Sequence, residues 1–404
     1  MRFLYSLGIR TYGLGILIWS LFNIKARQWV KGRKNWKSKL EKADIKGAIW
    51  IHCASLGEFE QGRPVLEEIK KRHPEKKILL TFFSPSGYEI RKNYPLADYV
   101  CYLPLDTPGN ARQFIEIAKP EIALFVKYEI WHNLYRELFK SGIAHYIISA
   151  IFRKDQIYFK PYGQWFRRTL KHTSRIFTQD ERSLRLLNEF EIENAEHAGD
   201  TRFDRVFEIS KNTGKISRAE RFTAGKLTLV AGSTWPADEK ILSEAAKAFS
   251  DLKIIIAPHL VDEKHIDSIR KLFPKSQLWS EPESEEDDSN TLIIDKIGLL
   301  SSLYASGNIA YIGGGFGAGI HNTLEPACFG LPVIFGPKYS KFKEAVDLIS
   351  QGGGFSISDS QSLRKKLQEL ISNEELRKKS GQLSGDYVER SRGATQKILS
   401  RIIG

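Results

Sequence analysis

Short apolar runs alternate with amphipathic, helix-like stretches along most of this 404-residue chain. Runs that favour β-structure occur in the first half at 48–53, 78–83, 99–103, 122–126, 145–149 and 175–177, and in the second half at 227–231, 253–257, 292–295, 308–312 and 332–335. Strands that alternate with helices pair in parallel, and the helices cover both faces of the sheet. The pattern predicts an α/β fold with two doubly wound parallel sheets.

The polar stretch 210–223 separates the two series of strands and is typical of a linker. With 42% hydrophobic residues, the chain can bury two cores of ordinary size. We therefore expect one domain at 43–209 and another at 224–404. The acidic stretch 281–290 is expected to be a solvated loop without a function of its own.

Residues 1–42 are expected to form a membrane anchor followed by a polybasic segment. The stretch 3–22 is mostly apolar but contains Arg10 and Thr11, which leaves 12–22 as the longest run with few polar interruptions. That run is too short to cross a hydrocarbon core comfortably, since crossing takes roughly 20 residues. Lys and Arg then recur up to Lys39, interleaved with Trp, which suits anionic headgroups. We favour a helix at the membrane surface; a single tilted span and a soluble core helix are the alternatives.

The basic character of the chain is local. Ten Lys or Arg and one Glu in residues 1–42 account for +9 of the formal net charge of +13. The remainder of the chain is nearly neutral, so nucleic acid is not an expected partner. The three cysteines lie far apart and show no zinc spacing, which predicts a reduced protein that faces the cytosol and has no structural metal.

A glycine-rich loop follows the predicted strand 308–312, with glycines at Gly313, Gly314, Gly315, Gly317 and Gly319. Glycines let a ligand approach the backbone closely, and a short helix after the loop points unpaired N–H groups toward it. The spacing fits neither the P-loop nor the dinucleotide fingerprint. The loop therefore predicts an anion site. Glu325 falls in the first turn of the helix, where its alternative role is only to complement the helix dipole.

Two carboxylates follow strands of the first domain. Glu58 comes directly after the strand 48–53, and Glu129 directly after the strand 122–126. A carboxylate at the end of a buried strand suggests binding or catalysis. The alternatives are structural: Ser55 and Glu58 match a capping box, and Glu129 can form a salt bridge with Lys127 or with a neighbouring basic side chain.

Polar side chains also follow strands of the second domain, beside the glycine loop and His321. Ser233 and Thr234 come after the strand 227–231, and His259 comes after 253–257. All three can donate hydrogen bonds to a phosphate. Helix capping or turn formation is the alternative.

Six motifs, taken in order, resemble those of the Kdo transferases, which transfer 3-deoxy-D-manno-oct-2-ulosonic acid (Kdo) from its CMP donor to the lipid A precursor. They are SLGE at 55–58, FFSPSGYE at 82–89, YEIW at 128–131, GSTWPADE at 232–239, APHLVDE at 257–263 and GGGFGAGIHNTLEPACFGLPVIFGP at 313–337. The match runs from the N-terminal segment to about Pro337 and continues more loosely to the end. Two positions depart from the family pattern, because His132 stands where proline is expected and Arg202 where lysine is expected.

The resemblance implies an inverting transferase with a glycosyltransferase B fold. In that fold two Rossmann-like domains, here an acceptor domain at 43–209 and a nucleotide-sugar donor domain at 224–404, face each other across a cleft. It also implies CMP-Kdo as donor, the lipid A precursor as acceptor, no metal, no cofactor, and a place at the cytoplasmic face of the inner membrane.

The same resemblance assigns roles to four residues. Glu58 matches the family's proposed general base, and Glu129 matches its second essential acidic position. Asn322 and Glu325 match the donor-binding motif N-x-x-E-P. The chemistry agrees, since glycosyl transfer needs a base for the acceptor hydroxyl and a positive cradle for the departing phosphate. Glu325 is then expected to accept hydrogen bonds from ribose hydroxyls.

The segment 158–175 mixes aromatic with basic side chains and includes Arg167, Arg168 and Lys171. Such a segment suits the phosphates and the acyl boundary of a lipid acceptor, although an ordinary solvated helix face is the alternative. Two other functions stay open: another two-domain sugar-nucleotide enzyme, such as a UDP-sugar transferase or a UDP-sugar 2-epimerase, and a membrane-peripheral anion-binding protein without catalysis.

Overall fold

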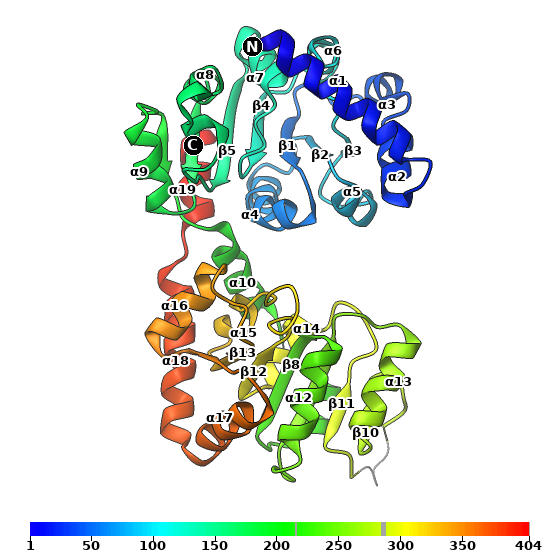
Figure 1. Ribbon diagram of the computed structural model, residues 1–404, viewed down its shortest axis with the longest axis vertical. Helices are drawn as coiled ribbons and strands as arrows, with labels where there is room; N and C mark the ends of the chain where they lie inside the picture. Colours follow the sequence, from blue (N-terminus) through cyan, green and yellow to red (C-terminus); the bar gives the residue numbers. More distant parts are fainter. Residues whose placement is uncertain (215, 284–287, 404) are drawn as a thin grey trace. The chain divides into compact units, whose positions relative to one another are not determined.

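The computed structural model describes residues 1–214, 216–283 and 288–403 (Figure 1). The chain divides into two compact units. The first comprises Met1–Asp204 with the C-terminal segment from Arg392, and the second comprises Arg205–Ser391. Each unit is an α/β sandwich around one parallel sheet, as the strand pattern predicts.

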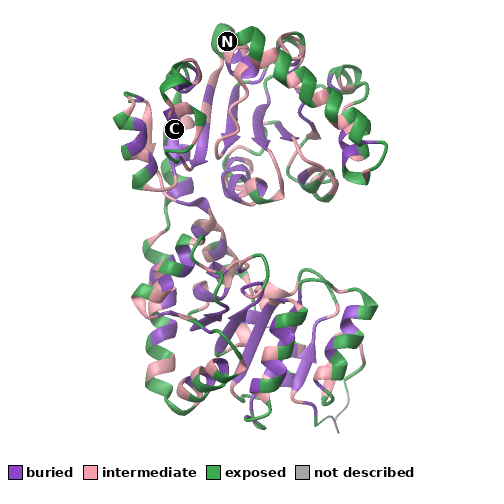
Figure 2. Ribbon diagram, viewed as in Figure 1, coloured by how far each residue is buried: buried purple, intermediate pink, exposed green. Residues whose placement is uncertain are grey.

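The first unit is built on a seven-stranded sheet in the order β3-β2-β1-β4-β5-β6-β7, with every pair of neighbours parallel. Most of these strands are apolar runs buried on both faces, as a sheet covered by helices on two sides requires (Figure 2). The strands are β1 (Ile49–Cys53), β2 (Ile78–Phe82), β3 (Tyr99–Tyr102), β4 (Ile122–Val126), β5 (Ala144–Ala150), β6 (Arg175–Thr178) and β7 (Ala195–His197).

Two hydrophobic clusters cover the two faces of this sheet. Trp50 and Phe125 belong to one cluster, with residues of α3, α6, α7, α8 and α9. Ile51 and Leu80 belong to the other, with residues of α4 and α19. The helices of the unit are α1 (Arg2–Trp19), α2 (Ile24–Gly32), α3 (Trp36–Lys42), α4 (Leu56–Arg72), α5 (Pro85–Arg91), α6 (Pro108–Ala118), α7 (His132–Lys140), η1 (Ile157–Phe159), η2 (Pro161–Gly163), α8 (Gln164–Lys171), α9 (Glu181–Glu189) and α19 (Ala394–Ile402).

The division into units differs from the expected domains in two places. The chain end was assigned with residues 224–404, but α19 packs on the first unit through Ile398 and Leu399, which are buried. The backbone amides of Gly393 and Thr395 also donate to the Asp204 carboxylate at 2.6 and 2.7 Å. The expected linker 210–223 is largely helical, because α10 (Thr201–Asn212) and α11 (Ser217–Thr223) occupy most of it.

The second unit contains another seven-stranded parallel sheet, in the order β10-β11-β9-β8-β12-β13-β14. Its strands are β8 (Thr228–Thr234), β9 (Lys253–Pro258), β10 (Ser276–Leu278), β11 (Thr291–Ile293), β12 (Ile309–Ile312), β13 (Val333–Phe335) and β14 (Gly354–Ser356). Its other helices are α12 (Pro236–Ala246), α13 (Glu263–Leu272), α14 (Leu300–Leu303), η3 (Tyr304–Ser306), α15 (Leu324–Cys328), α16 (Lys343–Gln351), α17 (Ser360–Ser372) and α18 (Glu374–Arg390). Of the expected acidic loop 281–290, residues 284–287 lie outside the described part of the chain.

Helix α1 rests on the first unit by one side only. Tyr5 donates its hydroxyl to Asp106 at 2.7 Å, and the ring of Tyr12 stacks on Phe83 at 6.2 Å between centroids. A Cβ on Gly13 would lie 2.5 Å from the Leu105 side chain, so glycine permits the close approach of the helix. None of the described α1 residues is buried (Figure 2). Among the described helices, none is both long and apolar enough to cross a membrane. The anchoring role of α1 stays a prediction.

Candidate active site

The two carboxylates predicted in the first unit follow neighbouring strands. Glu58 comes after β1 and Glu129 after β4, and these strands pair directly, from Ile49 opposite Ile122 to His52 opposite Phe125. The strand order reverses direction between β1 and β4, and loops at such a point diverge and leave room for a ligand. The topology therefore brings Glu58 and Glu129 to the same end of the sheet.

Glu58 lies in the first turn of α4, but it does not form the capping box. Ser55, the N-cap residue, makes no side-chain cap hydrogen bond and instead donates its hydroxyl to the Glu58 carboxylate. The other carboxylate oxygen lies 3.6 Å from the Lys127 ammonium nitrogen, and the Glu58 side chain is 15% exposed. The carboxylate is thus aimed at the end of β4.

Lys127 adopts a left-handed backbone conformation, with φ of 67°. Its backbone amide donates to the Ile148 carbonyl at 2.8 Å, which continues the pairing of β4 with β5 for one more residue. A lysine at positive φ is uncommon and costs conformational energy, of order 1–3 kcal/mol. The turn directs the Lys127 ammonium group toward Glu58, not toward Glu129 as the expected salt bridge would require.

The Glu129 carboxyl group has a strongly raised pKa. Burial raises its pKa to about 7, the negative charge of Glu58 adds to the rise, and the Trp131 indole and the Lys127 charge oppose it. A carboxyl group with a pKa near neutrality exchanges a proton readily at physiological pH. The pair therefore contains one carboxylate beside a cation and a second that titrates near pH 7.

Trp131, His52 and Thr81 form a chain of hydrogen bonds next to Glu129. The Trp131 indole N–H donates to His52 Nε2 at 3.2 Å, and His52 Nδ1 lies 2.9 Å from the Thr81 hydroxyl. Complete burial lowers the His52 pKa to about 3, so the ring is neutral although Nε2 lies 4.0 Å from a Glu129 carboxylate oxygen. The contact with Glu129 is consequently not an ion pair at neutral pH.

In the second unit, the glycine loop after β12 packs against the ends of β8 and β13. A Cβ on Gly313 would lie 2.3 Å from the Ser233 carbonyl oxygen, and one on Gly315 would lie 2.6 Å from the Gly336 Cα. Gly314 has φ of 90°. Any side chain at 313 or 315 would collide with backbone, so these glycines are needed for packing.

Asp238 holds the loop in place. Its buried carboxylate accepts from the Gly314 amide at 2.9 Å, from the Tyr311 hydroxyl at 2.8 Å and from the Trp235 amide at 3.0 Å. Burial raises the Asp238 pKa, and the Gly314 amide is the strongest influence in the opposite direction. Neither the helix pattern nor the motif spacing assigned a role to Asp238, although it lies within GSTWPADE.

Three aromatic rings gather beside the loop. His259 stacks on Trp235 at 4.7 Å and on His321 at 4.6 Å between ring centroids, and the Trp235 indole N–H donates to His321 Nε2 at 2.9 Å. Burial lowers the His321 pKa, and the neighbouring His259 adds to this effect. Neutral His321 is the acceptor that the Trp235 indole needs. The sequence predicted His259 and His321 as site residues but missed Trp235 between them.

Ser233 and Thr234 point to different surroundings. The register between β8 and β9 shifts between Gly232 and Thr234, and Ser233 has φ of 52°. Thr234 is fully buried and donates its hydroxyl to Glu239 at 2.9 Å. That hydroxyl is engaged inside the unit, which corrects the expectation that Thr234 donates to a phosphate. Ser233 is half-buried and stays a candidate.

Glu325 is held by two neighbouring side chains. It accepts from the Ser301 hydroxyl at 2.7 Å and from the Asn322 amide group at 3.0 Å, while Asn322 Oδ1 accepts from the Leu324 amide at 3.1 Å. The helix that follows, α15, has only five residues, and its N-cap is Thr323. Because so short a helix has a small dipole, the ordering of Glu325 by Asn322 is the more substantial effect.

The expected acceptor residues are divided between structural and exposed roles. Arg167 donates to the carbonyls of Tyr158 and Lys160, and Lys171 pairs with Glu191 at 3.4 Å. Arg168 is exposed and lines a cavity of the first unit together with residues of α1 and α7. All three residues line a second cavity of about 410 Å³ together with Glu189 and Glu191, and of the three only Arg168 also lines the cavity next to α1 and α7.

One departure from the family pattern has a local reason. The His132 amide donates to the Tyr5 hydroxyl at 3.3 Å, and the His132 ring lies 3.8 Å from the Trp165 ring. A proline at 132 would lack that N–H. His132 therefore connects α1 to the segment that carries Glu129. Arg202, the other departure, donates to Asp200 at 2.7 Å.

No group of three or more His, Cys, Asp or Glu that can hold a metal ion occurs among residues 1–214, 216–283 and 288–403.

Sequence relatives decide the family. The model of the family described as 3-deoxy-D-manno-octulosonic-acid transferase (kdotransferase) matches residues 28–205. A 3-deoxy-D-manno-octulosonic acid transferase from Aquifex aeolicus (strain VF5) is 30% identical over 363 residues, which cover 86% of this chain and 94% of that protein. The chain belongs to the Kdo transferase family. It is a glycosyltransferase, and a second family member, from Haemophilus influenzae (strain ATCC 51907 / DSM 11121 / KW20 / Rd), is 25% identical over 372 residues, 87% of this chain and 85% of that protein.

Solved structures support the fold. UDP-GlcNAc 2-epimerase from Neisseria meningitidis superposes with a TM-score of 0.62 at 17% identity, over 88% of this chain and 99% of that one. Acinetobacter baumannii MurG gives a TM-score of 0.55 at 12% identity, over 88% and 99%. At such low identity these likenesses concern the architecture alone. Two parallel α/β units of the glycosyltransferase B type are thus confirmed for this Kdo transferase family member.

Proposed function

We propose that this glycosyltransferase moves Kdo from CMP-Kdo to the lipid A precursor with inversion at the anomeric carbon, and that Glu58 is the general base. The observation that carries the proposal is the pair of carboxylates, Glu58 and Glu129, at the reversal point of the first sheet with Lys127 beside them. Glu129 has a raised pKa and a buried hydrogen-bonded support, which is typical of catalytic positions.

The proposed step transfers one proton and replaces one bond at the anomeric carbon of Kdo. The acceptor hydroxyl gives its proton to Glu58 while its oxygen bonds to the anomeric carbon of Kdo, and the bond from that carbon to the CMP phosphate breaks. Attack on the face opposite the leaving phosphate inverts the configuration. Because the pKa of Glu129 is about 7, this group is largely protonated below neutrality. Its neutral form removes a negative charge from the neighbourhood of the proposed base, Glu58.

The second unit is assigned the nucleotide. Ser233, His259 and the amides of Gly315 and Phe316 are proposed to supply the polar hydrogens for the phosphate at the ends of β8, β9 and β12. The other amides of the glycine loop, at Gly313, Gly314 and Gly317, already donate within the unit. Glu325 is proposed to accept from ribose hydroxyls. Its two observed hydrogen bonds leave acceptor capacity, because a carboxylate offers about four lone-pair sites.

The acceptor and the membrane are assigned to the first unit. Helix α1 exposes a series of large apolar side chains whose exposed fractions lie between 49% and 78%: Phe3, Leu4, Leu7, Leu14, Leu17, Ile18, Trp19, Leu21 and Phe22, the last two directly after the helix. A soluble protein seldom leaves so many together. We propose that this side of α1 lies in the membrane interface, at the cytoplasmic face of the inner membrane, and that Arg168 binds acidic groups of the lipid acceptor.

One incubation tests the proposal. Purified protein is mixed with CMP-Kdo and the lipid A precursor, and the lipid is examined by mass spectrometry. The expected product is the precursor plus at least one Kdo residue, with release of CMP. A parallel incubation with UDP-GlcNAc addresses the epimerase-like fold. Conversion of UDP-GlcNAc without transfer from CMP-Kdo would overturn the proposal in favour of a sugar-nucleotide epimerase.

A further inference from the structure

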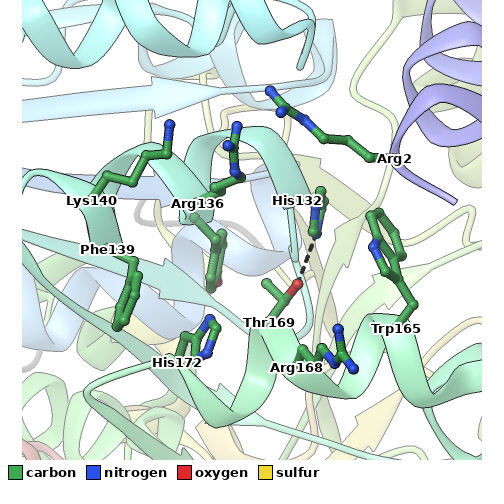
Figure 3. Close-up of a pocket in the computed structure, with 10 residues that line it drawn as sticks. Arg2, His132, Arg136, Phe139, Lys140, Trp165, Arg168, Thr169 and His172 are labelled. Carbon is green, nitrogen blue, oxygen red and sulfur yellow. Dashed lines mark hydrogen bonds between the residues drawn. The ribbon is translucent and has the colours of Figure 1, made fainter.

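A cavity of 370 Å³ lies in the first unit between α7, α8 and the start of α1 (Figure 3). None of the residues proposed for proton transfer lines it. Its walls combine long basic side chains with aromatic rings, a combination that suits a molecule with an acidic head and an apolar body. The lining residues are Arg2, His132, Tyr135, Arg136, Phe139, Lys140, Trp165, Arg168, Thr169 and His172.

Four permanent cations surround the opening, and little negative charge compensates them. In the view of Figure 3, Arg2, Arg136 and Lys140 lie along one side and Arg168 along the other. Glu137 lies within 3.4 Å of both Arg136 and Lys140. Among the described residues, Arg2 and Arg168 have no acidic partner within ion-pair distance. The cavity thus keeps a net positive charge of about three, which favours an anion with more than one oxygen.

The aromatic part of the wall consists of rings packed on one another. His132 packs on Trp165 at 3.8 Å, and its Nδ1 lies 2.9 Å from the Thr169 hydroxyl. Burial lowers the His132 pKa to about 4, so the ring is uncharged at pH 7. Phe139 stacks on His172 at 4.4 Å and is 53% exposed. These rings offer an apolar surface next to the cations.

The start of α1 contributes a cation to the cavity. Arg2, which lines it, is followed directly by Phe3 and Leu4, whose side chains are 77% and 61% exposed. A ligand whose charged group lies among the arginines can place its hydrocarbon part against the rings of Phe139 and Trp165, which also line the cavity. A small soluble anion would leave this apolar surface uncovered.

We infer that this cavity binds the phosphate of a membrane lipid headgroup, with Arg2, Arg136 and Arg168 on the phosphate oxygens and Phe139 beside the first methylenes. The inference rests on the proposed attachment of α1 to the membrane surface. It adds a site of defined chemistry that orients the first unit on the bilayer. Through Tyr5, which contacts both His132 and Asp106, the occupied cavity would also fix α1 against the segment that carries Glu129.

Calorimetric titration with short-chain, water-soluble lipids tests the site on the full chain. Dihexanoyl phosphatidic acid is expected to bind at least 10-fold more tightly than inorganic phosphate and than dihexanoyl phosphatidylcholine. The double substitution Arg136→Gln with Arg168→Gln is expected to weaken phosphatidic acid roughly 10- to 30-fold, since each cation contributes about 1 kcal/mol near an anionic group. Equal affinity in the double variant and the unmodified protein would overturn the inference.

A matched control separates the cavity from net charge. Arg182→Gln with Arg185→Gln removes the same two charges from exposed positions of α9 that do not line the cavity, and it should leave the affinity unchanged. Phe139→Ala tests the apolar wall. It should weaken phosphatidic acid and not inorganic phosphate, and an equal effect on both would remove the lipid part of the inference.

Two further measurements identify which lipid supplies the bound phosphate and separate this inference from the proposed function. Displacement of phosphatidic acid by the lipid A precursor would assign the site to a phosphate of the acceptor, and the lack of displacement would assign it to a bulk phospholipid; both agree with a lipid phosphate. The titrations contain no CMP-Kdo. If the protein binds phosphatidic acid but transfers no Kdo, the proposed function fails and the cavity assignment stands. If it transfers Kdo but does not bind phosphatidic acid, the cavity assignment fails and the proposed function stands.

Discussion

The Lys127 ammonium nitrogen lies 3.6 Å from a carboxylate oxygen of Glu58, although Glu129 is its closer neighbour in the sequence. The left-handed turn at Lys127 causes this choice of partner. One cation consequently influences two carboxylates, since it pairs with Glu58 and its charge also lowers the pKa of Glu129. The arrangement makes the two acidic groups interdependent, and the first two predictions use this property.

Replacement of Glu58 by glutamine should reduce transfer by about 10²- to 10⁴-fold, because an amide cannot take the proton of the acceptor hydroxyl. Glutamine can still accept the Ser55 hydroxyl hydrogen bond, so thermal unfolding should change little. The affinity for CMP should also be unchanged, since the nucleotide is assigned to the second unit. Initial rates, melting temperature and CMP titration measure the three quantities.

The matched control is Glu68→Gln, a charge removal on the same helix, α4, at a side chain that pairs with Arg72 on the surface. It should retain full activity. Near-normal transfer by Glu58→Gln would refute the base assignment.

Glu129 should make folding stability depend on pH. Its folded pKa of about 7 exceeds the usual value of 4.5, so the folded state binds the proton more tightly. Between these two values the folded state carries more protons than the unfolded state. Its contribution to stability therefore falls as pH rises through this window, by up to about 3 kcal/mol. Glu129→Gln should abolish that contribution. Denaturant unfolding of both proteins at pH 5 and pH 8 gives the difference.

Comparison with Glu129→Gln is needed because other groups titrate in the same range. Burial lowers the pKa of His52 to about 3 and that of His132 to about 4, and such groups add stability as pH rises. The difference in unfolding free energy between the unmodified protein and Glu129→Gln cancels the contributions of both histidines. In Glu58→Gln the loss of the neighbouring negative charge should lower the pKa of Glu129, so that its contribution to stability is lost at lower pH. Parallel stability curves for the unmodified protein and Glu129→Gln would contradict the raised pKa.

The strands were largely predictable from the sequence. The long apolar runs match β1, β2, β4, β5, β8 and β9 to within a few residues, because buried parallel strands need continuous hydrophobic side chains. The strands β7, β10 and β14 were missed. Each has only three residues, and none is fully buried, so their hydrophobic signal is weak.

The site was predictable in position but not in detail. That Glu58 and Glu129 lie together follows from the strand ends, whereas the partners of Lys127 and Thr234 do not. Thr234 turns inward because the register shifts at Ser233, a local irregularity that periodicity does not reveal. The return of α19 to the first unit is also invisible in the pattern, since Ile398 and Leu399 resemble any other buried helix positions.

In the second unit, Glu325→Ala should weaken CMP binding by about 1–3 kcal/mol, roughly 5- to 150-fold, because it leaves ribose hydroxyls without a charged acceptor. Ser301→Ala should have a smaller effect, since it removes only one of the hydrogen bonds that orient the carboxylate. Glu375→Ala, at an exposed position of α18, is the control. Calorimetric titration with CMP decides the point, and an unchanged affinity would leave Glu325 with a structural role alone.

The apolar side of α1 can be tested without removing the helix. Tyr5, Tyr12 and Gly13 contact the body of the first unit, whereas Leu14, Ile18 and Phe22 are 58%, 57% and 78% exposed. A triple substitution of the exposed residues by serine should therefore preserve the fold and the melting temperature. Binding to anionic liposomes should fall at least 10-fold, because burial of each such side chain contributes about 1.5–3 kcal/mol.

Flotation with liposomes of mixed zwitterionic and anionic lipid measures this binding. The control is a triple serine substitution at Ile90, Leu260 and Ile297, which are also exposed, at 58%, 46% and 86%, but lie on other elements. It removes similar apolar surface from the protein and should float like the unmodified chain. Deletion of residues 1–24 is a less specific experiment, because it also removes the Tyr5 donor from buried Asp106. If the α1 variant and the control float equally well, α1 does not attach this transferase to the membrane, and its exposed side chains require another explanation.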